Sequence, residues 1–283
     1  AKLGTGGTPL SFTNQDILGR QVNAGHNFNT NVDYKLNDRD ILTNALNLNM
    51  RKFDDNSIAT YSELNSAEAL VDFYNRPRDS HVTSSMIDYT LAFRRTLEPR
   101  EHALSSEIRF TRSRNNYPTD LERQPLAVPG LLDDGVLDPA IERERDHTIS
   151  LTQTLNAQLD YTRTLAQRTK LETGYKGTGR WLDRDYSVLK DDAGAGTWLP
   201  SNLSNDLDFS EQVQAAYAVL SQGAGKFDLQ GGLRAEYANR NFSLSNENTK
   251  YPYSYTSLFP SAVALYKFDD ATQAKVAYSR RIR

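Results

Sequence analysis

The chain lacks cysteine and long apolar runs, and its 283 residues carry a net charge of −3. The missing cysteine excludes disulfide bridges but identifies no compartment, because many cytosolic proteins also lack it. The charge leaves no basic stripe to neutralise phosphates, which argues against a nucleic-acid partner. No run approaches the eighteen or so apolar residues of a membrane helix. The mean hydropathy of −0.65 is typical of a soluble protein, yet a β-barrel gives a similar average because its polar lumen-facing residues offset its apolar ones.

Catalytic and metal-binding patterns are also scarce. The four histidines are His26, His81, His102 and His147. They have no helical metal-pair spacing and form no H-E-x-x-H motif. Asp133-Asp134-Gly135 and Asp191-Asp192 lack the ligand spacing of a calcium loop, and no serine can be tied to a histidine. We therefore predict no catalytic residue, no metal site and no cofactor.

Strict alternation of apolar and polar residues is the strongest positive feature. Between Gln21 and Leu36 one face carries Val22, Ala24, Phe28, Val32, Tyr34 and Leu36. The other face carries asparagine, aspartate and lysine. Because successive side chains of a strand point to opposite faces, this segment is predicted to be a long strand with one apolar and one polar side.

Similar segments recur along the whole chain. They predict about ten strands, at residues 21–36, 41–53, 84–97, 103–114, 148–163, 169–182, 207–220, 226–244, 258–268 and 272–283. In the segment 207–220 the apolar positions are Leu207, Phe209, Val213, Ala215, Tyr217 and Val219. In a membrane barrel the apolar positions of each strand are expected to face lipid.

The predicted connections are alternately short and long. The short turns are 37–40, 98–101, 164–168, 221–225 and 269–271, and the long loops are roughly 54–83, 113–147, 183–206 and 245–257. An all-β, antiparallel up-and-down transmembrane β-barrel, with short periplasmic turns and long extracellular loops, has this order. We predict that residues 1–283 form one such barrel segment. A soluble β-meander or sandwich is the alternative.

Ten strands could close a small barrel or form a slice of a wider one. The chain stops directly after Ile282 without a closing turn, and an open slice has unpaired edges that lipid does not tolerate. We expect an internal slice of a larger barrel, incomplete at the C-terminus and also at the N-terminus. No basic and apolar leader precedes Ala1, so either a signal peptide has been removed or the chain begins inside a longer protein.

The stretch Ser257–Arg283 resembles a hairpin of TonB-dependent outer-membrane receptors, in particular the outer membrane protein β-barrel family. The matching positions are Phe259-Pro260-Ser261, Tyr266-Lys267, Asp269-Asp270 and Tyr278-Ser279-Arg280-Arg281-Ile282. Asn31–Leu42 is similar to another hairpin of that family. The resemblance implies a bacterial outer-membrane location and a barrel of about twenty-two strands. It also implies a plug domain and a TonB box upstream of Ala1, and uptake of scarce ligands such as iron–siderophore complexes, cobalamin, glycans or peptides.

Charged residues gather on the expected lumen-facing side of neighbouring strands. They are Arg94, Glu107, Arg109, Lys170, Glu172, Lys176, Arg180, Arg234 and Glu236. One interpretation is a ladder of cross-strand ion pairs lining a polar interior. The other is a surface that contacts a plug or guides a charged ligand.

Aromatic residues occupy the predicted loops at Tyr117, Trp198, Tyr251, Tyr253 and Tyr255. They are candidates for ligand binding by stacking, although tyrosines at loop bases also form interfacial girdles. The leading hypothesis is a non-enzymatic receptor barrel for TonB-dependent uptake, with lipid, a plug, the TonB complex and an unknown small or oligomeric ligand as partners. The alternative is a structural or adhesive outer-membrane β-barrel without active transport.

Overall fold

A computed structural model describes residues 2–3, 9–98, 101–126, 141–192, 194–245, 249–269 and 271–280. Within these residues all regular structure is β. The strands are β1 (Lys2–Leu3), β2 (Pro9–Lys35), β3 (Asp40–Asn65), β4 (Leu70–Glu98), β5 (His102–Pro125), β6 (Glu142–Ala166), β7 (Thr169–Asp191), β8 (Leu199–Pro200), β9 (Asn205–Ala224), β10 (Phe227–Leu244), β11 (Thr249–Lys250), β12 (Tyr253–Lys267) and β13 (Gln273–Ser279). All ten predicted strands are present, and no helix in the described part is long and apolar enough to cross a membrane.

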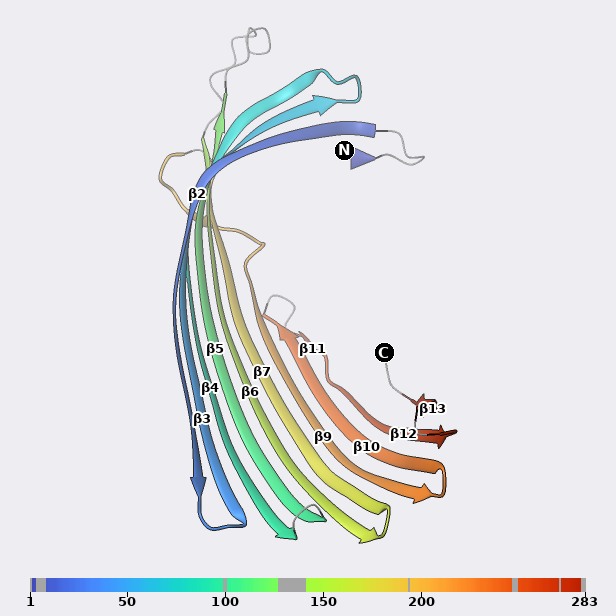
Figure 1. Ribbon diagram of the computed structural model, residues 1–283. Coiled ribbons are helices and arrows are strands. Elements are labelled where there is room, and N and C mark those ends of the chain that lie inside the picture. The colour runs from blue at the N-terminus through green and yellow to red at the C-terminus, as the bar shows by residue number, and fades with distance from the viewer. Residues whose placement is uncertain are drawn as a thin grey trace, which may run out of the picture.

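The strands form one antiparallel up-and-down sheet. Each long strand pairs with the next one in the chain, in the order β1-β2-β3-β4-β5-β6-β7-β9-β10-β12-β13, while β8 pairs β7 and β11 pairs β10. Figure 1 shows the sheet as a curved trough that does not close on itself. The fold class predicted from the sequence is therefore confirmed, with an open sheet rather than a closed cylinder in the described residues.

The two faces of the sheet differ in chemistry and in exposure. Leu233 and its neighbours on one face of β10 are exposed, at 50% for Leu233, whereas the Glu236 side chain on the other face is only 17% exposed. The apolar face is the convex one, because a curved sheet spreads its convex side chains apart and crowds the concave ones. Polar side chains consequently line the hollow of the trough.

The convex apolar surface, called here the apolar band, is continuous across the sheet because the register aligns its members. Tyr34 pairs with Leu42, and Leu42 pairs with Phe93. Its main members are Phe28, Val32, Tyr34, Leu42, Leu46, Leu48, Ile87, Tyr89, Leu91, Phe93, Leu104, Ile108, Phe110, Leu151, Leu155, Leu159, Tyr161, Leu171, Tyr175, Trp181, Leu220, Phe227, Leu229, Leu233, Tyr237, Leu258, Tyr266, Val276 and Tyr278.

Strand β9 departs from the expected orientation. Its apolar positions, including Phe209 and Tyr217, share the concave face with Arg180 and Arg234, because Tyr217 pairs with Arg234 and Glu211 pairs with Arg180. The prediction that this apolar series faces lipid is wrong. Alternation separates two faces of a strand but does not say which face is outside. Here small alanines occupy the convex side of β9, and Tyr217 covers Gly174 on the concave side.

The predicted long loops are largely wrong, because the strands continue through them. Residues 54–83 are mostly paired, with Asp54 opposite His81 in the β3–β4 ladder. Strand β5 reaches Pro125, β7 reaches Asp191 and β12 begins at Tyr253. Beyond the apolar band polar residues occupy many positions on both faces, so the regular alternation in the sequence disappears while the backbone pairing persists. Residues 127–140, part of the predicted loop 113–147, lie outside the described residues.

We call the part of β2–β6 beyond the apolar band the extension; it comprises residues 9–26, 51–86, 112–126 and 141–149. Figure 1 shows the start of β2 and the β3–β4 hairpin bending over the hollow of the trough at this end. Gly19 permits close packing in the bent region, because a Cβ there would lie 2.4 Å from Ser57 Cβ. The extension therefore covers one end of the concave surface.

Candidate ligand-binding surface on the concave face

All nine charged residues predicted to line the lumen, including Lys170 and Glu172, lie on the concave face. Arg109 and Asp88 are cross-strand neighbours, and Arg109 Nε donates a hydrogen bond of 2.8 Å to Asp88 Oδ1. Arg94 and Glu107 instead line a small cavity of about 290 Å³ with Thr43, Gln158 and Asp160. This part of the surface combines one strong ion pair with charged groups that face open space.

Two further predicted residues, Lys176 and Arg180, belong to β7. Lys176 is half-buried beside Ala215 of the adjacent strand. The Arg180 guanidinium lies 5.9 Å from the centre of the Phe209 ring. A guanidinium over an aromatic ring at this distance gains a modest cation–π attraction. The apolar residues of β9 therefore support charged groups from β7 within the hollow.

A large cavity on the concave face lies along β10, β12 and β13. It has a volume of about 850 Å³, and its lining includes Arg234, Glu236, Arg240, Tyr253, Tyr255 and Phe259. Ligand pockets for small molecules commonly have volumes of about 300–1,000 Å³ and combine aromatic walls with a few polar groups. We call this cavity the β10–β13 groove. It unites two of the predicted aromatic residues with two of the predicted charges.

The contacts inside the β10–β13 groove hold its side chains in place. Arg234 Nη2 lies 3.0 Å from Glu236 Oε2, and Arg240 forms an ion pair with Glu211 of β9. The rings of Tyr253 and Tyr255 are 5.8 Å apart, and the Arg240 guanidinium lies 6.0 Å from the centre of the Tyr255 ring. Neither Arg240 nor Phe259 was predicted from the sequence to be a site residue. Arg240 shares its face of β10 with Arg234 and Glu236 because even numbers of residues separate the three positions, which was the available signal.

The predicted aromatic residues do not form one cluster. Tyr117 lies within β5 and Tyr253 and Tyr255 within β12, so the prediction of loop positions is wrong for these three. Trp198 precedes β8, and its ring lies 4.1 Å from the Arg145 guanidinium. Tyr251 precedes β12, and its ring centre lies 6.0 Å from that of Phe242. Only Tyr253 and Tyr255 line the β10–β13 groove.

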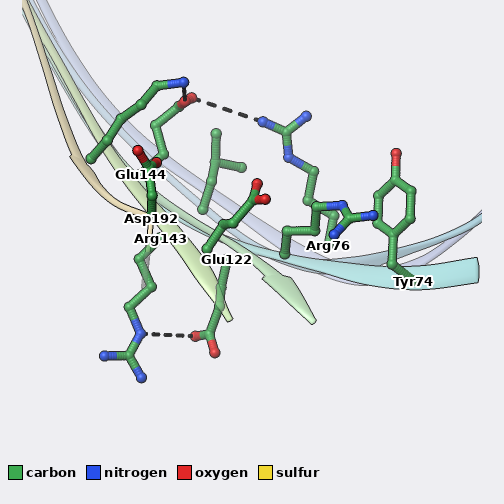
Figure 2. A pocket seen from close by; sticks show the side chains of 10 residues that line it. Tyr74, Arg76, Glu122, Arg143, Glu144 and Asp192 are labelled. Atoms are coloured by element: carbon green, nitrogen blue, oxygen red, sulfur yellow. Dashed lines mark ion pairs between the residues drawn. The ribbon is translucent and has the colours of Figure 1, made fainter. Parts of the chain in front are cut away.

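A second cleft, between the extension and the end of β7, is drawn in Figure 2. It has a volume of about 210 Å³. Glu144 lies 3.8 Å from Arg76 and 3.3 Å from Lys190, while Arg143 approaches Glu122 at 4.0 Å (Figure 2). The charged groups thus neutralise one another, and the space is below the usual size of a ligand pocket. We interpret this cleft as an ion-pair network that holds the extension together.

Aromatic stacking reinforces the same region. The ring centres of Tyr61 and Tyr74 are 4.9 Å apart with planes inclined by 10°, and the Arg123 guanidinium lies 4.3 Å from the Tyr74 ring centre. Burial, aided by the Glu63 carboxylate, raises the pKa of Tyr74. Burial also raises the pKa of Asp146, with a further contribution from Glu144. These groups stabilise packing in the extension and carry no evident chemistry of their own.

Neither a metal centre nor a catalytic group emerges from the part of the chain that the structure describes. It contains no group of three or more His, Cys, Asp or Glu side chains that could hold a metal ion. His81 contacts Asp54 and Asp79, and His147 Nε2 lies 2.6 Å from Asn116 Oδ1. The arrangement on the concave face is suited to reversible binding through stacking and charge.

Comparison with known proteins assigns the architecture. The model of the outer membrane protein beta-barrel family matches residues 95–283, about two thirds of the chain. The chain belongs to this family. Membership places it in the bacterial outer membrane, in contact with lipid, which the apolar band fits. By the general rule for such barrels, the short turns mark the periplasmic end and the extension lies at the extracellular end. No curated protein matches the sequence.

Several solved outer-membrane proteins resemble this family member in structure. The ferric-catecholate import receptor Fiu of E. coli K12, in its closed form, has a TM-score of 0.51 at 9% identity, covering 96% of this chain and 50% of Fiu. The open form has a TM-score of 0.50 at 9% identity, covering 99% and 55%. The ferric preacinetobactin receptor BauA of Acinetobacter baumannii has a TM-score of 0.42 at 12% identity, covering 92% and 45%. The chain thus spans about half the length of these receptors, and at such identities the likeness concerns the fold alone.

Proposed function

We propose that the chain is the barrel portion of a TonB-dependent receptor that takes up a scarce ligand across the outer membrane. Siderophores, cobalamin, glycans and peptides are the candidate classes. The observation that carries the proposal is the β10–β13 groove, which lies on the concave face of an outer-membrane sheet and pairs tyrosines with arginines. The fold similarity to the import receptor Fiu supports it.

The receptor function requires no covalent chemistry from this chain. Tyr253, Tyr255 and Phe259 offer ring faces, while Arg234 and Arg240 offer charge-assisted hydrogen bonds. Arg94, Glu107, Arg109, Lys176 and Arg180 extend the charged surface across the hollow toward β4 and would contact a plug or guide a charged ligand. Residues 1–283 would form one barrel segment, and a plug domain and the TonB complex would supply gating and energy.

The decisive experiment is uptake by the full-length protein in cells with and without TonB. The probes are a ferric siderophore, cobalamin and a defined oligosaccharide, each radiolabelled. We expect one probe to accumulate only in cells with both the receptor and TonB. The double variant Arg240→Ala/Tyr255→Ala should lower binding of that probe, whereas Arg20→Ala, on the convex face of the extension, should leave it unchanged. Binding that persists fully in the double variant would remove the groove from the proposal.

An adhesive or structural barrel is the second candidate, and the extension favours it. Paired strands with polar faces project well beyond the apolar band, and they offer a broad surface to a macromolecule. In that case deletion of the extension would abolish cell-surface attachment, while no probe would accumulate in a TonB-dependent manner. The same pair of assays therefore separates the two functions.

A further inference from the structure

A groove on the convex face lies where the apolar band of β2–β6 ends and the extension begins. Its volume is about 730 Å³, and its lining includes His26, Met50, Lys52, Ser85, Arg114 and His147. The register sets His26 opposite Met50, Met50 opposite Ser85 and Ser85 opposite Arg114. The next partner of Arg114 is Leu151, a member of the apolar band. The groove is therefore continuous with the lipid-facing surface.

The lining is basic and contains no carboxylate. Lys52 points outward with a side chain that is 60% exposed and forms one ion pair of 3.3 Å, with Asp54. Arg114 makes no hydrogen bond or ion pair within the described residues. Arg51 also borders the groove, but its guanidinium is bonded to Asn23 of β2. Lys52 and Arg114 are thus the cations available to a ligand.

Hydrogen-bond donors and an apolar floor complete the groove. Thr83 and Ser85 contribute hydroxyl groups, and His147 and Asn116 bond to each other at 2.6 Å along the rim. Met50, 60% exposed, and Ile149 supply apolar surface. Two cations, two hydroxyl donors and an apolar floor suit a phosphate that is attached to a lipid.

We propose that this groove binds the phosphate of a phosphorylated glycolipid headgroup in the outer leaflet of the outer membrane. Its height fits this ligand, because headgroups begin where the hydrocarbon region ends, and here the apolar band gives way to Lys52 and Arg114. The proposal depends on the outer-membrane location and not on ligand uptake.

The neighbouring sector of the convex face limits the site to β2–β6. Along the row that contains Arg114 and Leu151, the next partners are Asp183 of β7 and Asp208 of β9. These carboxylates would repel a phosphate at the same height. At this height the convex face therefore changes from basic on β5 to acidic on β7 and β9. A phosphate is attracted only to the basic part, so the glycolipid binds over β2–β6 alone.

The test is native mass spectrometry of the full-length protein in detergent, with a bis-phosphorylated glucosamine lipid and its phosphate-free counterpart as probes. The unmodified protein should retain the phosphorylated lipid and not the phosphate-free one. The double variant Lys52→Gln/Arg114→Gln should lose affinity for the phosphorylated lipid by about tenfold or more. Each basic residue near an anionic headgroup adds to the binding free energy, and the variant loses both contributions. The matched control Arg20→Gln, farther along the extension, should bind as the unmodified protein does.

Two comparisons keep the test decisive if the double variant folds poorly. The conservative variant Lys52→Arg/Arg114→Lys keeps both charges and should retain the lipid, and the two lipids can be compared on the unmodified protein alone. Equal retention of both lipids would overturn the proposal. Displacement of the lipid by millimolar inorganic phosphate would also overturn it, because the groove would then be a site for free anions.

Discussion

The convex surface changes character along each strand, and the contrast between its two parts explains most of the architecture. In the apolar band, Leu155, Leu159 and their neighbours face lipid. In the extension, the same faces of β3 and β4 carry Lys52, Asp54 and His81. Backbone pairing runs through both parts without interruption in register at the boundary. The length of a strand therefore does not measure how much of it lies in the membrane.

The largest expected effect comes from a charge in the middle of the apolar band. Leu155→Arg should destabilise the folded protein in a bilayer by about 2–4 kcal/mol, because an arginine on the lipid face loses its hydration near the midplane. Reversible unfolding of the full-length protein from lipid vesicles measures the change. Gln158→Arg is the control, since that side chain faces the polar hollow opposite Glu107. Equal losses for both variants would contradict the assignment of the two faces.

A second prediction concerns the bent part of the extension. In Gly19→Ala the new Cβ would lie 2.4 Å from Ser57 Cβ and 2.8 Å from Ser57 Cα, so the β2 and β3 backbones must separate. Overpacking of this kind costs about 1–3 kcal/mol. Faster hydrogen exchange in residues 9–26, with unchanged exchange in the apolar band, is the expected readout. Gly25→Ala provides the control, because its Cβ would approach only Met50 O, at 3.5 Å.

A smaller effect is expected from pH, within the extension alone. A hydrogen bond from His81 to Asp54, aided by the charge of Asp79, raises the pKa of His81 above 6.5, and the same bond lowers the pKa of Asp54. The protonated histidine stabilises the fold most at pH values below its unfolded pKa. This contribution is lost as the pH rises through the raised folded pKa. NMR titration of His81 measures the shift, and Asp54→Asn should reduce it; an unchanged pKa in that variant would refute the proposed cause.

The ten strands were predictable because their membrane-facing parts alternate strongly. Asp54–Asn56 shows why the extension was missed: both faces are polar there, so the sequence has the composition of a loop. What keeps Asp54 in a strand is its cross-strand partner His81, 27 residues away, and single-sequence periodicity contains no information about such pairing. The orientation of β9 was missed for a similar reason, since Tyr217 donates a hydrogen bond to Asp160 of β6, two strands away, and covers Gly174 of the adjacent β7.

The β10–β13 groove was only partly predictable. Arg234, Glu236, Tyr253 and Tyr255 stood out as charges and aromatics, but they were assigned to two separate sets, a lumen wall and a loop. The antiparallel register sets Glu236 opposite Ser257, Ala238 opposite Tyr255 and Arg240 opposite Tyr253. That register depends on where the connection after Leu244 returns to the sheet, and the sequence alone left residues 245–257 as one undivided loop.

The smallest expected effect completes the contrast between the two parts of the convex surface. Leu18 lies on the same face of β2 as Phe28 but within the extension, and it is 83% exposed. Because its surroundings there are water and not hydrocarbon, Leu18→Arg should change the free energy of unfolding by less than about 0.5 kcal/mol. The same vesicle-based unfolding assay measures both leucine variants under identical conditions. A loss for Leu18→Arg as large as that for Leu155→Arg would mean that the hydrocarbon region reaches Leu18, and the boundary drawn at Lys52 and Arg114 would then be misplaced.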